Sequence, residues 1–349
     1  MPTIDADAHV IETPFTWSFM RDDEQQFRPQ ILVRDPNDGA PTQARSRGEY
    51  WLIDGQLKSR NNVGKDVPPE AQDMRDVSAR IRHMDEIGID VQVLFPSLFL
   101  RPLTREPDID MALCRSYNRW LASIWKQAPE RLRWALVPPL LSMANPALMR
   151  EELEFCKENG ACAIFMRGME CDRLLGHRFF YPLYEMAQEL GLAICPHAGV
   201  GSYAYHDLAQ PQSSLMTFKF PVIASFESIL REEVPERFPD LGFAFIETSA
   251  QWVPYVMGEA RIRLARKGNA GRNLIDGKKI FITTQRTDDL AWLLDEIGDN
   301  NIIVGTDYGH RDTATEVEAI MRMANDGSVP KESTRKILET NPGILYGLA

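Results

Sequence analysis

"MDEIGIDVQVLFP", residues 84–96, joins an acidic, amphipathic segment to a short apolar run through one glycine, Gly88. Glycine ends helices well because it adopts left-handed backbone angles at little cost. The run that follows is apolar throughout rather than alternating, which is typical of a parallel strand covered on both faces. The stretch therefore predicts a helix, a glycine stop and a buried strand.

The same unit recurs along the chain, at 157–166, 188–197 and 295–307. Apolar runs that fit such strands lie at 3–8, 90–95, 134–139, 161–166, 192–197, 242–247, 279–284 and 301–307. Strands alternating with helices at this spacing predict a (β/α)8 TIM barrel, with residues 1–349 forming a single domain. An open, doubly wound parallel sheet is the alternative, because periodicity does not show whether a sheet closes.

Two expected helices have recognisable starts. In "SMANPALMREELEF", Asn145 is placed to cap the helix and Pro146 takes its first position. In "TDDLAWLLDEIG", Thr287 is followed by two acids, which suit a helix N-terminus.

Two stretches interrupt the repeat and are expected to lie at the barrel mouth. Residues 13–72 form a long insertion after the first strand, with a hairpin expected in "YWLIDGQ" (50–56), and we expect this insertion to act as a cap or lid. Residues 198–216 are expected to form a second long loop. Loops in such places usually carry specificity.

Composition excludes several classes of partner. The chain has 349 residues, a net charge of -11 and five cysteines without a CxxC pair. Nucleic acids and anionic membranes both require a basic surface, so neither is an expected partner. The cysteines are expected to be reduced thiols, and no apolar stretch approaches the roughly 20 residues of a membrane span, so we expect a cytoplasmic protein.

In a barrel of this kind, the active site lies at the C-terminal ends of the strands. The polar side chains expected there are Asp7, His9, Arg167, His197, Glu247, Asp307 and His310. Asp7 and His9 are two residues apart, so both point to the same face of one strand, as two ligands of one ion must. A metal ion would offset the cost of burying clustered carboxylates.

The other acids and histidines have less certain roles. The sequence around His197 favours the role of metal ligand, and that around Asp307 favours a metal ligand or a catalytic base. Glu247 fits a metal ligand, a general base or a structural partner. Glu12 and His310 are expected to orient ligands. His206 fits a substrate contact, an additional ligand or a solvated loop histidine.

Six motifs together resemble the amidohydrolase superfamily, in particular amidohydrolase family 2, the branch with aminocarboxymuconate semialdehyde decarboxylase and resorcylate-type decarboxylases. The resemblance runs nearly end to end, in "IDADAHVIE" (4–12), "MDEIGIDVQVLFPS" (84–97), "CPHAG" (195–199), "ERFPDLGFAFIETSAQWVPY" (236–255), "IGDNNIIVGTDYGH" (297–310) and "KILETNPGILYGL" (336–348). It implies a divalent metal ion bound by Asp7, His9, His197 and Asp307.

The chain departs from the family pattern at three positions. Asp7 stands where members commonly have the first histidine of His-x-His, as in the acid-x-His variants of some decarboxylases. Glu247 stands where several relatives place a catalytic histidine, which puts the usual acid/base assignment in doubt. Arg167 replaces the lysine whose carbamate bridges two metals elsewhere, so that binuclear centre is not expected. A second metal held by Glu12, His206 or Glu247 stays open.

The expected function is decarboxylation or hydrolysis of a small carboxylated or carbonyl compound with zinc, manganese or iron. Asp307 or Glu247 would move the proton, and Arg167 would pair with a substrate carboxylate. The alternative is an iron-dependent monooxygenase, since a carboxylate-rich site with two histidines is typical of non-haem iron proteins. A third reading is a non-catalytic barrel subunit that supports an active paralogue. The expected assembly is a homodimer or a pair with a paralogous subunit.

Overall fold

The computed structural model describes residues 1–33, 48–60, 62–210, 212–266, 274–325, 327 and 329–348. Its main sheet has eight strands. In sheet order they are β1 (Ile4–Val10), β5 (Val91–Pro96), β6 (Leu132–Leu136), β7 (Ala161–Arg167), β10 (Ala193–His197), β11 (Phe243–Phe245), β12 (Ile280–Thr284) and β13 (Ile302–Val304). Each pair of neighbours in this order runs parallel. All eight predicted strands are confirmed.

The sheet closes where its last strand returns to its first. A parallel bridge joins Ala8 of β1 to Tyr308, just beyond β13, and the His9 amide donates to the Tyr308 carbonyl at 2.9 Å. The prediction of a (β/α)8 barrel is therefore confirmed over the open sheet.

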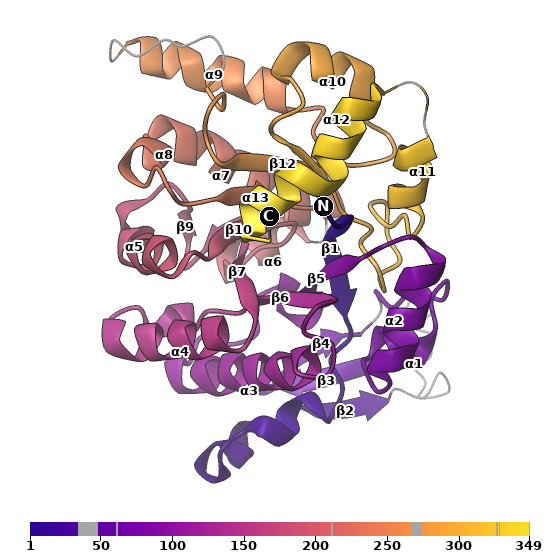
Figure 1. The fold of residues 1–349 in the computed structure, drawn as a ribbon. Coiled ribbons are helices and arrows are strands. Elements are labelled where there is room, and N and C mark those ends of the chain that lie inside the picture. The colour runs from indigo at the N-terminus through magenta and orange to yellow at the C-terminus, as the bar shows by residue number, and fades with distance from the viewer. Residues whose placement is uncertain are drawn as a thin grey trace.

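Helices surround the barrel, as Figure 1 shows. The longer ones are α2 (Val77–Glu86), α3 (Pro107–Trp125), α4 (Pro146–Glu158), α5 (Tyr181–Leu190), α7 (Phe220–Arg231), α9 (Val253–Ala265) and α10 (Leu290–Ile297). Shorter ones are α1 (Pro69–Gln72), α6 (Tyr203–Ala209), α8 (Val234–Arg237), α11 (Ala319–Asn325), α12 (Lys331–Arg335) and α13 (Asn341–Tyr346). No helix in the described ranges is both long and apolar enough to cross a membrane.

The ends of several elements follow from local chemistry. Asn145 caps α4 by accepting from the Leu148 amide, as predicted. The helix expected from Thr287 instead begins at Leu290, because the Asp289 side chain accepts from the Trp292 amide and caps there. The strand expected to reach residue 139 ends at Leu136, two residues before the prolines at 138 and 139, which lack the N–H that a ladder needs.

The insertion after β1 contains a small antiparallel sheet of β2 (Gln30–Val33), β3 (Glu49–Ile53) and β4 (Gln56–Ser59). The predicted hairpin is confirmed: Asp54 and Gly55 turn between β3 and β4 with φ of 49° and 67°. Part of the insertion, residues 34–47, lies outside the described residues. Its role as a cap or lid stays a prediction.

The second expected loop, 198–216, is partly helical. It contains α6, capped by Ser202, and enters a single π-helical turn, Leu215–Lys219. Helical structure satisfies backbone groups that a long irregular loop would leave to water.

Candidate metal centre

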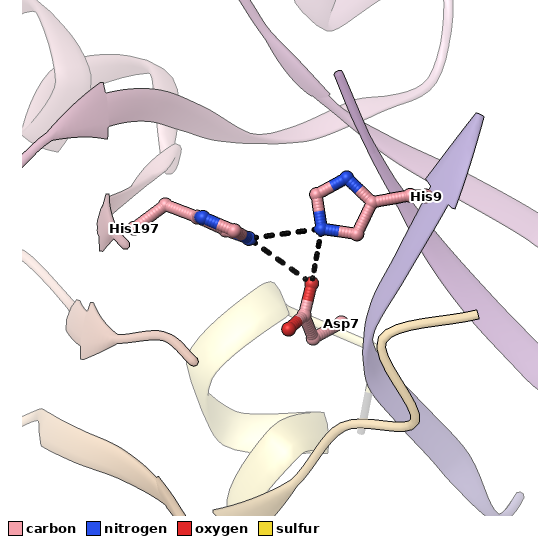
Figure 2. Close-up of side chains that lie close together, drawn as sticks. All are labelled: Asp7, His9 and His197. Carbon is pink, nitrogen blue, oxygen red and sulfur yellow. Dashed lines mark hydrogen bonds and ion pairs between the residues drawn. The ribbon is translucent and has the colours of Figure 1, made fainter. Parts of the chain in front are cut away.

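Three side chains from two strands meet at the C-terminal end of the barrel (Figure 2). Asp7 and His9 lie on β1 and His197 ends β10. The Nε2 atoms of the two histidines are 3.1 Å apart, and Asp7 Oδ1 lies 3.4 Å from His9 Nε2 and 3.3 Å from His197 Nε2. All three residues are buried.

The positions of the imidazole protons show what this arrangement fits. His9 Nδ1 lies 3.0 Å from the Pro96 carbonyl, and His197 Nδ1 lies 3.1 Å from the Ala198 carbonyl. A carbonyl only accepts hydrogen bonds, so each Nδ1 carries a proton, and in this tautomer the neutral form of each ring presents a lone pair at Nε2. Two lone pairs and a carboxylate oxygen therefore face one another, and a cation between them would remove the repulsion.

The spacing agrees with a metal ion. Ligands bonded at about 2.0–2.2 Å stand roughly 2.8–3.6 Å apart at octahedral or tetrahedral angles. The three distances between Asp7, His9 and His197 fall within that interval. The residues present fit a divalent metal ion.

Burial and neighbouring charges set the protonation of these groups. Burial lowers the pKa of His9, which keeps its ring neutral and able to bind a cation. Burial by itself would raise the pKa of Asp7, but the imidazoles of His197 and His9 hold it below its ordinary value. Asp7 is therefore an anion beside the neutral ring of His9.

Asp307 lies just beyond β13, the last strand of the barrel, and approaches the same centre from there. Its Oδ1 lies 3.4 Å from His9 Nε2 and 2.7 Å from His310 Nδ1, and its Oδ2 accepts from Thr315 Oγ1 at 2.6 Å. His310 stacks on His9 with ring centroids 3.7 Å apart, and its Nε2 lies 2.7 Å from Ser97 Oγ. His310 therefore orients both Asp307 and His9.

Glu247 follows β11 and lies beside His197. Its Oε2 is 3.4 Å from His197 Nδ1 and accepts no hydrogen bond from a described residue. Burial raises the pKa of Glu247 well above its ordinary value, and the charges of Asp312 and Asp7 add to the effect. Burial likewise raises the pKa of Asp307, with Glu247 adding to it.

Backbone strain marks the same two acids. Glu247 and Asp307 have φ of 63° and 50°, in the left-handed region that non-glycine residues rarely adopt. Such conformations cost of order 1–3 kcal/mol and cluster at functional sites. These backbone angles take both residues out of strand geometry.

The remaining predicted site residues lie elsewhere. Glu12 accepts hydrogen bonds from the amides of Ser97 and Leu98, both at 3.0 Å, so its carboxylate holds the loop after β5. Burial raises the pKa of Glu12 to about 7. His206 lines the cavity described below and lies 3.5 Å from Asp207 Oδ1.

Arg167 is committed to contacts within the chain. Its Nε and Nη2 pair with the two oxygens of Glu170 at 2.7 and 2.6 Å, and its Nη1 donates to the carbonyls of Phe99 and Arg101. The fork expected to bind a substrate carboxylate is therefore occupied by Glu170.

A cavity of about 680 Å³ lies next to the centre, because Glu247 and Ala198, which both contact His197, line it. The insertion contributes Trp51 and Asn62 to its wall, and the segment after β10 contributes Phe218. Its charged lining residues are Glu12, Arg60, Arg101, Lys219, Glu247, Arg311 and Asp312. The chain carries a net charge of -11, yet cations outnumber acids here, which suits an anionic ligand.

Sequence reasoning missed Arg101 and Asp312. Arg101 follows β5 by five residues, in "SLFLR", and Asp312 follows Asp307 by the same number. Both lie beyond the strand ends, in segments whose path the strand pattern does not predict.

The fold and the buried cluster of acids and histidines define a metal-dependent barrel enzyme. The amidohydrolase family model matches residues 4–348, and the chain belongs to that family, whose members are metal-dependent enzymes.

Solved structures resemble the chain over nearly its whole length. An amidohydrolase of Mycobacterium avium subsp. paratuberculosis matches with a TM-score of 0.76 at 20% identity, covering 99% of both chains. The 5-carboxyvanillate decarboxylase of Sphingomonas paucimobilis matches at 0.68 and 16%, again covering 99% of each. A dihydroxybenzoic acid decarboxylase of Polaromonas with bound manganese and the inhibitor 2-nitroresorcinol matches at 0.67 and 19%, covering 99% of this chain and 97% of that one.

Proposed function

We propose that the protein is a metal-dependent decarboxylase of a small carboxylated compound. The observation that carries the proposal is the convergence of Asp7, His9 and His197 on one point, next to a cavity whose lining has more cations than acids. Two of the similar structures are decarboxylases, which favours this reaction over hydrolysis.

The proposed metal ligands are Asp7, His9, His197 and Asp307. When bound, a divalent ion supplies a Lewis acid that orients the substrate oxygens and accepts electron density as carbon dioxide leaves. The donor set of two imidazoles and two carboxylates suits zinc, manganese or iron. The manganese in the Polaromonas structure makes manganese the first metal to test.

Glu247 is the residue we assign to proton transfer. Loss of carbon dioxide breaks a C–C bond and leaves an electron pair on the substrate carbon, which must then take a proton. Glu247 lines the cavity, whereas Asp307 is held by His310 and Thr315. A buried carboxyl with a raised pKa holds a proton that it can donate.

Arg101 replaces Arg167 as our candidate for binding a substrate carboxylate. Its side chain lines the cavity, and the hydrogen bond described for it goes to a neutral partner, Ser59 Oγ, at 3.1 Å. A guanidinium that pairs with no carboxylate among the described residues is suited to hold one from the substrate.

Carbon dioxide release from hydroxylated aromatic carboxylates tests the proposal. We expect the manganese-loaded protein to decarboxylate at least one member of a panel that includes 5-carboxyvanillate and dihydroxybenzoates. Chelation should abolish the activity and manganese should restore it. In His9→Ala the metal content should fall below about a tenth of an ion per chain, because an Nε2 ligand is lost.

His177→Ala is the matched control. His177 caps a short 3-10 helix by accepting from the Phe179 amide and lies outside the centre, so this variant should keep its metal and activity. Full turnover by metal-free protein would refute the proposal. If the protein instead releases an alcohol or amine from esters or amides and forms no carbon dioxide, its reaction is hydrolysis and not decarboxylation.

The monooxygenase alternative stays a prediction. The carboxylates beside the two histidines are the feature that favours it, since non-haem iron sites combine these ligand types. Anaerobic purification with iron, followed by oxygen-uptake measurements with substrate, separates the two reactions. Oxygen consumption coupled to substrate loss would favour oxygenation.

A further inference from the structure

We infer that Arg80, a buried arginine on α2, is a positioning residue for the proposed metal centre. It holds the backbone of His9 directly, and it holds the segment that carries Asp307 through the ring of Tyr308. The inference rests on the proposed function, because His9 and Asp307 are two of the proposed metal ligands. It adds a residue that does not line the cavity.

The guanidinium of Arg80 lies wholly inside the protein, with an exposed fraction of 0%. Its Nε donates to Gln92 Oε1 at 2.6 Å, and its Nη1 donates to the carbonyls of His9 and Ala71 at 3.1 and 3.2 Å. Its Cζ lies 3.6 Å from the centre of the Tyr308 ring. One side chain therefore contacts β1, β5 and the segment after β13.

The contact with His9 completes the hydrogen bonding at the closure of the barrel. The amide of His9 donates to the Tyr308 carbonyl, and in a parallel ladder the His9 carbonyl would accept from the amide of His310. That amide instead donates to the Asp307 carbonyl at 3.2 Å. Because Arg80 Nη1 supplies the missing donor, both backbone groups of His9 are held in place.

The contact with Tyr308 acts on the segment that carries Asp307. Tyr308 is buried and directly follows Asp307 in the chain. Helix α2 contacts its side chain twice, since Arg80 covers the ring and His83 Nδ1 lies 2.8 Å from the hydroxyl oxygen. A guanidinium is attracted to the face of an aromatic ring, and more strongly away from water. Holding this ring limits the movement of the neighbouring Asp307.

Stability alone does not account for an arginine at this position. Gln92 Nε2 donates to Asp5 Oδ2 at 2.9 Å, so a glutamine separates the cation from this carboxyl group. The Nη2 of Arg80 has no hydrogen-bond partner among the described residues. Burial lowers the pKa of Arg80 to about 10, which leaves it charged near neutral pH. Burying a charge is costly, and well-packed apolar side chains often stabilise a core at least as well. The planar fork is needed instead for its geometry.

Titration of the chelator-treated full chain with Mn²⁺, with free Mn²⁺ measured by electron paramagnetic resonance, tests the inference. We expect Arg80→Met to raise the Kd for Mn²⁺ by about 10- to 100-fold, the usual cost of removing a group that orients a metal ligand. Arg80→Lys should also bind more weakly, because a single ammonium nitrogen does not reproduce a planar fork. Since it keeps the charge, it serves as the test if Arg80→Met does not fold.

Met84→Ala is the matched control for stability. Met84 lies on the same helix and is fully buried, so its truncation should lower the melting temperature and leave the Kd unchanged at temperatures where the protein is folded. Tyr308→Phe is a second control. It loses the hydroxyl that contacts His83 but keeps the ring beneath Arg80, so its Kd should also be unchanged.

The possible results separate this inference from the proposed function. A wild-type Kd in every folded Arg80 variant would overturn the inference, and so would an equal loss of affinity in Met84→Ala, since destabilisation would then explain the result. No Mn²⁺ binding by the wild type would overturn the inference and the proposed function together. Mn²⁺ binding that depends on Arg80, without carbon dioxide release from any tested carboxylate, would support the inference and overturn the proposed function.

Discussion

At the scale of single residues, the contrast between Arg101 and Arg167 shows that position along a strand does not decide a role. Arg167 ends β7, where a catalytic residue is expected, but its fork binds Glu170. Arg101 lies beyond β5 and faces the cavity. The two arginines differ in whether their guanidinium donors are available to a substrate. That availability depends on neighbours that are far apart in the sequence.

We therefore predict that Arg101→Met raises KM for the carboxylated substrate by about 10- to 150-fold, since a hydrogen bond to a charged group contributes about 1.5–3 kcal/mol. Steady-state kinetics on the metal-loaded protein measure this. Arg167→Met should leave KM largely unchanged and instead lower the melting temperature, because it strands the buried carboxylate of Glu170. A raised KM in Arg167→Met and an unchanged KM in Arg101→Met would instead assign substrate carboxylate binding to Arg167.

At the scale of elements, the packing of the segment after β13 against β1 fixes the position of Asp7, one of the proposed metal ligands. The amides of Thr306 and Asp307 both donate to the Asp7 carbonyl, at 3.1 and 2.9 Å. A Cβ placed on Gly305 would lie 2.2 Å from Asp7 Cβ. Glycine at this position lets the two chains approach closely enough for Asp7 and Asp307 to reach one centre.

Gly305→Ala should therefore displace Asp7. We expect a loss of about 1–3 kcal/mol in the free energy of unfolding, as for other overpacked sites, together with weaker metal binding. Urea denaturation and metal titration measure the two effects. Gly258→Ala on α9 is the control, because its new Cβ would meet no atom closer than 3.8 Å; it should keep wild-type metal binding. Unchanged metal affinity in Gly305→Ala would contradict this account of the closure.

At the scale of the whole molecule, one buried carboxyl ties the first and last strands of the barrel together. Asp5 accepts from the Thr306 amide at 2.9 Å, from Thr306 Oγ1 at 2.6 Å and from Gln92 Nε2 at 2.9 Å. Burial raises the pKa of Asp5 from 3.8 to about 6, although these hydrogen bonds oppose the shift. The folded chain therefore holds this proton at a pH where the unfolded chain has lost it.

This difference predicts how stability depends on pH. Between about pH 4 and pH 6 the folded state binds more protons at Asp5, so raising the pH lowers the free energy of unfolding, by up to about 3 kcal/mol. Asp5→Asn should remove this part of the slope, whatever its effect on overall stability. Denaturant unfolding of metal-free protein at several pH values measures the slope. An identical slope in both proteins would show that Asp5 is ionised throughout.

The sequence by itself determined the eight strands and most of the proposed first centre, whereas the closure of the sheet rests on the contact between Ala8 and Tyr308. Eight apolar runs, four of them following a glycine stop, are a local pattern that predicts parallel strands buried on both faces. Once the barrel was inferred, Asp7, His9, His197 and Asp307 had to gather at one rim, because strand ends meet there. The hairpin at Asp54 and Gly55 could also be predicted, because an Asp-Gly pair is a local signal for a turn with left-handed backbone angles.

Only the tertiary structure decided which charged groups are free to act. Glu170 binds the guanidinium of Arg167, Arg101 faces the cavity, and Asp312 lies close to Glu247 and Asp307. All three arrangements depend on the path that the chain takes beyond the strand ends. The physical reason is that strand periodicity is set by each residue's immediate neighbours. Hydrogen-bond partners and local charge beyond the strand ends are set by the path of the connecting segments through space.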